Sequence, residues 1–250
     1  MKSKSTQASA AALFGAGLIG LTALVAATPA AAIEIRADVV VDMTPMGENV
    51  PKPTREKPAY YLPVPGGYQE LGGIFRRKVP PPPPEAEIEE IFTRALAEQG
   101  YLPATAKTPP SLIISYTWGR ILPILVGRGK LAVVQNEADM LSMVAGDKLD
   151  ARSTNHPSAW MSEILTNERR PQRFLKVMAF DYNAWKNHRT VLLWQAHVTT
   201  PGILVTNIMP TLIEAAAPAL GSGTARPIIA TVPFIPPGSV IAGTPRYKSP

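Results

Sequence analysis

The sequence predicts an α+β domain with a small, mainly antiparallel sheet and helices packed on one face. Three observations lead to this fold class. An amphipathic helix pattern covers 85–99, two β-rich segments flank a polar turn over 174–199, and a second helix pattern runs from 207 to 220. The full predicted order is strand, helix, strand, insertion, hairpin and helix, which favours an α+β fold over repeated βαβ units.

Residues 1–32 have the layout of a secretory signal peptide. Lys2 and Lys4 precede an apolar run over 10–27, and small residues follow up to Ala32. The run is close to the length of a membrane span, but its alanine and glycine content favours a cleaved signal. We expect cleavage after Ala32, a periplasmic or secreted mature chain, and no transmembrane segment after cleavage. Because the chain has no cysteine, it cannot carry a lipid on a cleavage-site cysteine.

Residues 33–84 are predicted to hold one strand and a proline-rich segment. Apolar and charged residues alternate over 33–42, which predicts a half-buried strand. Over 60–71, prolines and glycines interrupt the apolar residues, so we expect at best a short strand and a turn. The unbroken proline run over 80–84 is typical of an extended spacer. Because 27 prolines cluster in this way, both this segment and the tail over 222–250 are expected to be irregular.

The predicted α+β domain covers 85–221 and begins with the clearest helix pattern in the chain. Over 85–99, acidic residues occupy the first turns, apolar residues follow at helical spacing, and Gly100 stands where a left-handed cap forms. A strand is predicted over 111–118, where the residues that point one way are Leu112, Ile114, Tyr116 and Trp118.

Residues 120–170 are predicted to form a helical insertion packed on one face of the sheet. Helix patterns cover 136–145 and 158–168. An apolar cluster from Ile121 to Val126 precedes them and has basic neighbours. Such a cluster suits either burial in the core or a weak contact with a membrane surface.

An antiparallel hairpin of two central strands is predicted over 174–182 and 190–199. Both segments are rich in apolar, β-branched and aromatic residues, and the residues between them are polar. A closing helix follows the hairpin, with Asn207 as its predicted N-cap and Gly221 as its stop.

Three segments of the predicted domain also follow a pattern found in known proteins. They are Ala-Leu-Ala-Glu-Gln-Gly-Tyr over 95–101, Ser-Leu-Ile-Ile-Ser-Tyr over 111–116, and Thr-Val-Leu-Leu-Trp-Gln-Ala over 190–196. In these segments the chain resembles a family of bacterial envelope proteins of unknown function, many of them lipoproteins, that share a small α+β domain. The chain departs from that pattern at Pro110-Ser111, where an acidic residue is usual, and in lacking the lipid-bearing cysteine. The resemblance implies an envelope location and transfers no catalytic residue.

Few residues have the spacing of a catalytic or metal site. His156, His188 and His197 lack metal-ligand spacing, and no cysteine is present, so the sequence predicts no metal site and no cofactor. The candidate pair for acid–base chemistry is Asp181 and His197, which could meet across the predicted hairpin. No serine in a Gly-x-Ser-x-Gly turn accompanies this pair.

The candidate binding contact is Trp185, which lies in the polar turn of the hairpin beside Lys186 and Arg189. An exposed tryptophan next to basic residues suits contact with a partner protein or an envelope glycan. The formal net charge is +6, but the basic residues form no long run, so nucleic-acid binding is not predicted.

Taken together, these features predict an exported envelope protein with a non-enzymatic binding or structural role. Its expected partner is an envelope protein or glycan. Two alternatives remain open. One is an envelope hydrolase that uses Asp181 and His197, and the other is a peripheral membrane-associated protein that uses the cluster from Ile121 to Val126.

Overall fold

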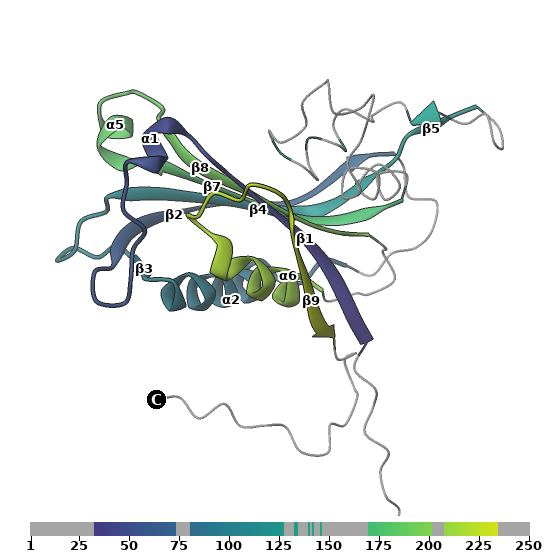
Figure 1. Cartoon of the computed structure of the whole chain (residues 1–250), viewed down its shortest axis with the longest axis horizontal. Helices are drawn as coiled ribbons and strands as arrows, with labels where there is room; N and C mark the ends of the chain where they lie inside the picture. Colours follow the sequence, from purple (N-terminus) through teal and green to yellow (C-terminus); the bar gives the residue numbers. More distant parts are fainter. Residues whose placement is uncertain are drawn as a thin grey trace, which may run out of the picture. The chain divides into compact units, whose positions relative to one another are not determined.

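A mixed, mostly antiparallel sheet of seven strands forms the centre of the fold, in the order β3-β2-β4-β7-β8-β1-β9 (Figure 1). The computed structural model describes residues 33–73, 81–127, 133–134, 140, 142, 146, 170–201 and 208–234. Strand β2 is parallel to both β3 and β4, and the other neighbours are antiparallel. The predicted α+β fold class is confirmed.

The strands of this sheet are β1 (Ile33–Met43), β2 (Ala59–Gly72), β3 (Tyr101–Pro103), β4 (Leu112–Leu122), β7 (Gln172–Asp181), β8 (Leu192–Pro201) and β9 (Ile228–Phe234). The helices are α1 (Pro45–Glu48), α2 (Glu85–Glu98), α5 (Tyr182–Lys186) and α6 (Met209–Ala216), and a 3₁₀ turn (Ala217–Ala219) follows α6. Two short strands, β5 (Leu125–Val126) and β6 (Val133–Val134), form a separate two-stranded sheet.

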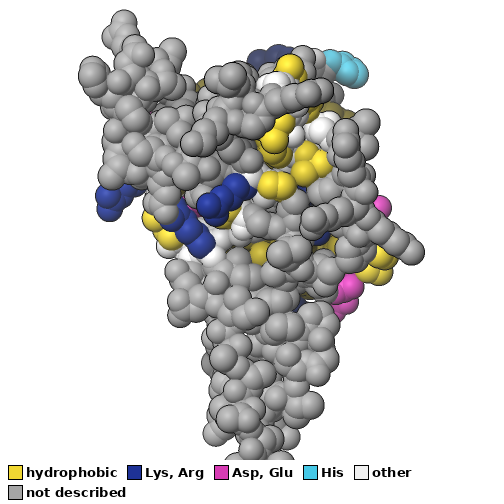
Figure 2. All heavy atoms as spheres, turned by 90° about the vertical axis from the view of Figure 1, so that its right-hand side faces the viewer, with side chains coloured by type: hydrophobic (Ala, Val, Ile, Leu, Met, Phe, Trp, Pro, Cys, Tyr) yellow, Lys and Arg dark blue, Asp and Glu magenta, His cyan; other side chains and the backbone are white. Residues whose placement is uncertain are grey.

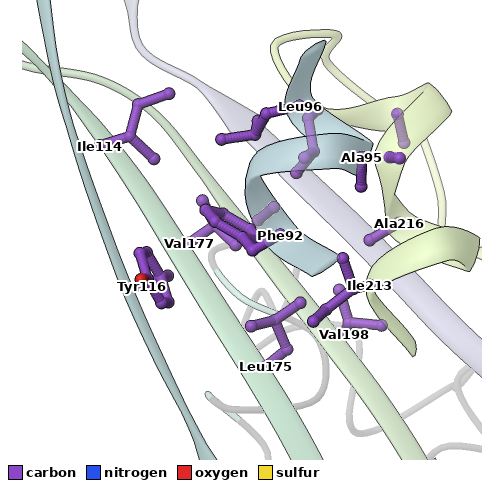
Figure 3. Close-up of a cluster of buried hydrophobic side chains, with 14 of the residues drawn as sticks. Phe92, Ala95, Leu96, Ile114, Tyr116, Leu175, Val177, Val198, Ile213 and Ala216 are labelled. Atoms are coloured by element: carbon purple, nitrogen blue, oxygen red, sulfur yellow. The ribbon is translucent and has the colours of Figure 1, made fainter. Parts of the chain in front are cut away.

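Helices α2 and α6 cover one face of the sheet, and the main core lies between them and the strands (Figure 1). In Figure 3, Phe92 of α2 and Ile213 of α6 lie among side chains of β4, β7 and β8. The Phe92 ring centroid is 4.3 Å from that of Tyr116. The four alternating residues of β4 that the sequence placed on one face are all buried in this core.

The ends of α2 agree with the sequence. Acidic residues occupy its first turn, Gln99 is its C-cap, and Gly100 follows with a φ of 85°. Glycine is favoured there because the left-handed region carries no steric penalty for a residue without a Cβ.

Two strands lie in segments that the sequence predicts to be irregular. Strand β2 is a strand of 14 residues rather than a short strand and a turn, and β9 occupies part of the expected irregular tail. Both are at or near sheet edges. β9 is the last strand, and β3 covers β2 only over Ala59–Tyr61. Proline has no backbone N–H to donate to a neighbouring strand. At an edge that position can face the side without a neighbour, so no hydrogen bond is lost, which explains why Pro63 and Pro65 are tolerated in β2.

The predicted hairpin is present as β7 and β8, paired from Gln172 and Pro201 to Phe180 and Leu192. The segment between them forms the short helix α5 rather than a plain turn. In the closing helix, Ile208 is the N-cap, while the expected cap Asn207 lies outside the described residues.

The face of the sheet away from α2 and α6 carries a small second cluster of Ile121, Phe174 and Met140. Met140 belongs to the predicted insertion and packs against the two strand residues of this cluster. The rest of both predicted insertion helices lies almost wholly outside the described residues, as do residues 1–32. Within the described ranges, no helix is long and apolar enough to cross a membrane.

Candidate binding site

The turn that carries the predicted binding contact is a short helix with both ends fixed. Helix α5 follows β7 directly, and Oδ1 of Asp181 accepts a hydrogen bond from the Ala184 N–H at 2.6 Å. After the helix, His188 has a left-handed φ of 59°, and the Arg189 N–H donates to the Ala184 carbonyl at 3.0 Å. These bonds hold the backbone of residues 181–189, which we call the α5 turn.

Trp185 is the large exposed side chain of the α5 turn. It is 52% exposed, and its ring centroid is 6.0 Å from that of Tyr182. Lys186, His188 and Arg189 are exposed as well. The structure therefore presents an aromatic ring and several basic side chains on one turn. This combination offers a stacking face together with hydrogen-bond donors.

A cavity of ≈ 180 Å³ lies between the α5 end of the sheet and residues 50–53, which we call the strap. Its apolar lining comes from Met43, Val50, Pro51, Pro53, Leu112, Leu193 and Trp194, and its polar lining from Lys52, Tyr101, Ser111, Asp181 and Asn183. Apolar walls with a few polar groups are typical of a small-ligand site. An adjoining hollow of ≈ 480 Å³ shares Met43, Gly47, Val50, Lys52 and Gly221 with this cavity.

Lys52 joins the strap to the segment that follows α6. Its Nζ donates to the Pro218 carbonyl at 3.0 Å and to the Ser222 Oγ at 2.7 Å. Burial lowers the pKa of Lys52 from its ordinary value. The strap is thus held over the cavity by a lysine that also lines it.

The structure does not bring Asp181 and His197 together. His197 lies opposite Lys176 on β7 and Val40 on β1, whereas Asp181 lies at the far end of β7, opposite Leu112. Five residues along a strand correspond to about 16 Å. Asp181 is an N-cap, and His197 is 3% exposed. The expected meeting across the hairpin is therefore wrong, because the register places the two residues at different levels of the sheet.

The acidic residue found near His197 is Asp42 rather than the expected Asp181. An ideal Cβ on Gly146 would lie 2.3 Å from Oδ2 of Asp42 and 3.3 Å from Cδ2 of His197, so both side chains lie against Gly146. The described residues contain no group of three histidine or acidic side chains placed to hold a metal ion. His156 lies outside them.

The apolar cluster from Ile121 to Val126 is divided between core and surface. Ile121 and Leu122 are buried in β4, whereas Leu125 and Val126 in β5 are 58% and 55% exposed. The neighbouring Arg120 is buried and paired with Glu70. Only the second half of the cluster is therefore available for contact with a membrane surface.

Sequence reasoning missed the cavity residues Lys52, Tyr101 and Gly221. They come from the strap, from the start of β3 and from the turn after α6, and no local motif links these segments. The sequence predicts Gly221 only as the stop of the closing helix. That prediction does not indicate that Gly221 also lines a cavity.

No family model matches the chain, and no curated protein matches it. Among solved structures, the chain is distantly similar to a PelC dodecamer from Paraburkholderia phytofirmans, with 11% identity and a TM-score of 0.32 over 70% of this chain and 92% of that one. It is also distantly similar to a PDZ domain protein from Parabacteroides distasonis, with 11% identity and a TM-score of 0.39. That match covers 80% of this chain and 39% of the other.

Proposed function

We propose that this chain is a non-enzymatic binding protein of the bacterial envelope that holds an envelope glycan at the α5 turn. The observation that carries the proposal is Trp185, an indole left 52% exposed on a helix whose backbone is fixed at both ends. Envelope location rests on the predicted signal peptide and on the family resemblance of the sequence.

A glycan suits this surface because sugar rings present C–H faces that stack on an aromatic ring, while their hydroxyls accept hydrogen bonds. Trp185 supplies the stacking face, and Lys186 and Arg189 supply the donors from the same turn. The strap cavity beside the turn adds apolar walls and the polar groups of Lys52 and Asn183 for a substituent of the sugar.

Binding of soluble peptidoglycan fragments, followed by tryptophan fluorescence and calorimetry, tests the proposal. We expect saturable binding that Trp185→Ala weakens about tenfold or more, since aromatic anchors dominate such contacts. Val64→Ala is the matched control, because Val64 is an exposed apolar residue of β2 that lies outside the α5 turn.

Three results would overturn this function. They are an absence of binding, equal binding by the two variants, and turnover of the fragments by the wild-type chain. If only proteins from the envelope bind, and Trp185→Ala abolishes that binding, the partner is a protein and the glycan assignment is wrong.

The exposed Leu125 and Val126 favour a second candidate function, a weak contact with anionic membrane surfaces. Flotation with vesicles rich in anionic lipid tests it. We expect a fraction of the chain to float, and the double variant Leu125→Ser with Val126→Ser to stay in the soluble fraction. Recovery of the wild-type chain only in the soluble fraction ends this candidate.

A further inference from the structure

The wall of the strap cavity contains a buried hydroxyl group that can donate to a ligand. Tyr101 lines the cavity and is 2% exposed. The indole N–H of Trp194 can only donate, so the Tyr101 oxygen is the acceptor of the bond between these two side chains. The described residues provide no acceptor for the Tyr101 O–H itself. Burial raises the pKa of Tyr101, against a smaller opposite effect of Trp194, so this group is a protonated donor at neutral pH.

Two further polar side chains of the lining have hydrogen-bonding capacity to spare. The ammonium group of Lys52 has three N–H donors. Two of them are used by the Pro218 carbonyl and the Ser222 hydroxyl. The side-chain amide of Asn183 forms no hydrogen bond within the part of the chain that the structure describes. The lining therefore offers donors for a ligand carbonyl and an amide oxygen that can accept from a ligand N–H.

The charges of the cavity lining balance each other. Its basic side chain is Lys52, and its acidic side chain is Asp181. Oδ1 of Asp181 already accepts a hydrogen bond from the Ala184 N–H. Because an ion buried without a counter-charge is costly, a lining with balanced charges suits a neutral ligand group better than an ionic one. A neutral group that both accepts and donates a hydrogen bond is an amide.

The apolar walls and the size of the cavity narrow the choice further. Met43, Leu193 and Trp194 contribute apolar wall, and the cavity volume is ≈ 180 Å³. An apolar cavity of about 150 Å³ can hold benzene. An acetamido group has fewer heavy atoms than benzene, so it fits this cavity with its methyl group against the apolar walls.

The adjoining hollow gives the cavity access to solvent. It has a volume of ≈ 480 Å³, it shares Lys52 and Gly221 with the cavity, and it is bordered by the exposed residues Glu48, Gly223 and Ala225. Small-ligand pockets commonly have volumes of about 300–1,000 Å³. The Glu48 carboxylate can accept hydrogen bonds from hydroxyl groups. A sugar ring can therefore occupy the hollow while one of its substituents enters the cavity.

We propose that the strap cavity binds the N-acetyl group of an amino sugar, and that it thereby selects N-acetylated glycans over glycans that carry only hydroxyl groups. The acetyl carbonyl accepts hydrogen bonds from Tyr101 and Lys52. The amide N–H donates to the side-chain oxygen of Asn183, and the methyl group packs on Trp194. This inference rests on the proposed function in taking the ligand to be a glycan, but it depends on the cavity residues rather than on Trp185.

The cavity lies at the other end of the sheet from the candidate membrane contact. Figure 1 shows α1 and α5 at one end of the sheet and β5 at the other. The β5 end faces the viewer in Figure 2, where lysine and arginine side chains lie beside hydrophobic ones. Membrane contact and binding in the cavity therefore use separate surfaces, and each can be lost without the other.

Calorimetric titration of the purified chain with chitotriose and, separately, with cellotriose tests the pocket. The two sugars have the same ring form and linkage, and the acetamido group of chitotriose is replaced by a hydroxyl group in cellotriose. We expect the Kd of chitotriose to be at least about tenfold lower, because its acetamido group adds hydrogen bonds and a buried methyl group.

Two variants should each reduce the preference for chitotriose about fivefold, which is the effect of one lost hydrogen bond. They are Tyr101→Phe, which removes the hydroxyl donor, and Asn183→Ala, which removes the acceptor. Tyr60→Phe and Asn187→Ala are the matched controls, because neither residue lines the cavity. The ratio of the two Kd values is the decisive readout, since a general disturbance of the fold weakens both sugars alike.

Several outcomes would overturn the N-acetyl pocket. Equal Kd values for the two sugars, with binding still lost in Trp185→Ala, overturn it and leave the proposed function standing. A preference that Tyr101→Phe or Asn183→Ala leaves unchanged also overturns it. If Tyr101→Phe does not fold, the exposed position of Asn183 keeps the second variant decisive.

Two other outcomes concern the class of ligand. Absence of binding by both sugars overturns the pocket and the proposed function together. If acetyl-alanyl-alanine amide binds with the same dependence on Tyr101 and chitotriose does not bind, the ligand is a peptide and the assignment to an amino sugar is wrong.

Discussion

Gly221 lies against the hydroxyl of Tyr101, and an ideal Cβ at position 221 would stand 1.9 Å from that oxygen. Gly221 has a φ of 68°. The Tyr101 hydroxyl in turn forms a hydrogen bond with the Trp194 side chain, whose ring centroid lies 6.0 Å from that of Tyr101. All three residues line the strap cavity. Gly221 therefore has two roles: it ends a helical segment, and its lack of a Cβ leaves space for the Tyr101 hydroxyl in the cavity wall.

Gly221→Ala should therefore destabilise the chain for two reasons, a left-handed backbone and a clash with Tyr101. We expect a loss of about 2 kcal/mol or more in the free energy of unfolding, measured with urea. Gly67→Ala is the control, because Gly67 has a φ of 72° and nothing within 4 Å of its ideal Cβ. Equal losses in the two variants would show that the Tyr101 contact does not matter.

Asp181 is predicted to act as a helix cap rather than as an acid or base. Asp181→Ala should lower the free energy of unfolding by about 1 kcal/mol and weaken glycan binding through Trp185, because the α5 turn loses its N-terminal hydrogen bond. Asp181→Asn should retain both properties, since asparagine caps nearly as well. Loss of binding in Asp181→Asn with stability intact would show that the carboxylate charge itself is needed.

Asp38 should make the fold less stable at neutral pH than a neutral residue would. Arg36 donates to its carboxylate from Nη2 at 2.8 Å and from Nε at 3.0 Å, yet burial raises the pKa of Asp38 above its ordinary value. A raised pKa in the folded state means that the stabilising contribution exists at low pH and is lost as pH rises through the folded pKa. Relative to the wild type, Asp38→Asn should gain unfolding free energy between pH 4 and pH 7. A relative loss over that range would mean that the ion pair with Arg36 outweighs burial.

Tyr116 should lower the free energy of unfolding at alkaline pH. Its hydroxyl is buried with no hydrogen-bond partner among the described residues, and burial, with Glu89 and other acidic neighbours, raises the pKa of Tyr116 to about 12. The stability due to the neutral phenol is present below pH 10 and is lost as pH rises toward 12. Tyr116→Phe should raise the unfolding free energy by about 1 kcal/mol at pH 7 and flatten the decline above pH 10. Tyr60→Phe, at a half-buried position, is the control; an equal flattening there would contradict the assignment to Tyr116.

The elements that the sequence predicts correctly are those with a strong local period. The apolar spacing over 85–99, the alternation in β4 and the paired β-rich segments of β7 and β8 each depend on neighbours within a few residues. The sequence predicts only a short strand in place of β2 and no strand in place of β9, because their prolines are tolerated only through their position near the sheet edges. That position is a property of strand order, which local patterns do not encode.

The same division separates the candidate sites. Trp185, Lys186 and Arg189 lie within five consecutive residues, so the sequence alone placed them on one turn. Whether Asp181 and His197 meet depends on the register between β7 and β8, which local sequence patterns do not give. The observed register places His197 opposite Lys176, away from Asp181.

The sequence by itself determined the fold class, the two helices over the core and the place of Trp185 in a polar turn, because these follow from periodicity and residue chemistry within short segments; the exposure of Trp185 is a finding of the structure. Only the tertiary structure decided that the strap closes a cavity with Tyr101 and Gly221, and that Arg120 and Arg173 stand opposite each other in the sheet. Both depend on contacts between segments far apart in the chain, whose geometry is fixed by strand order and register.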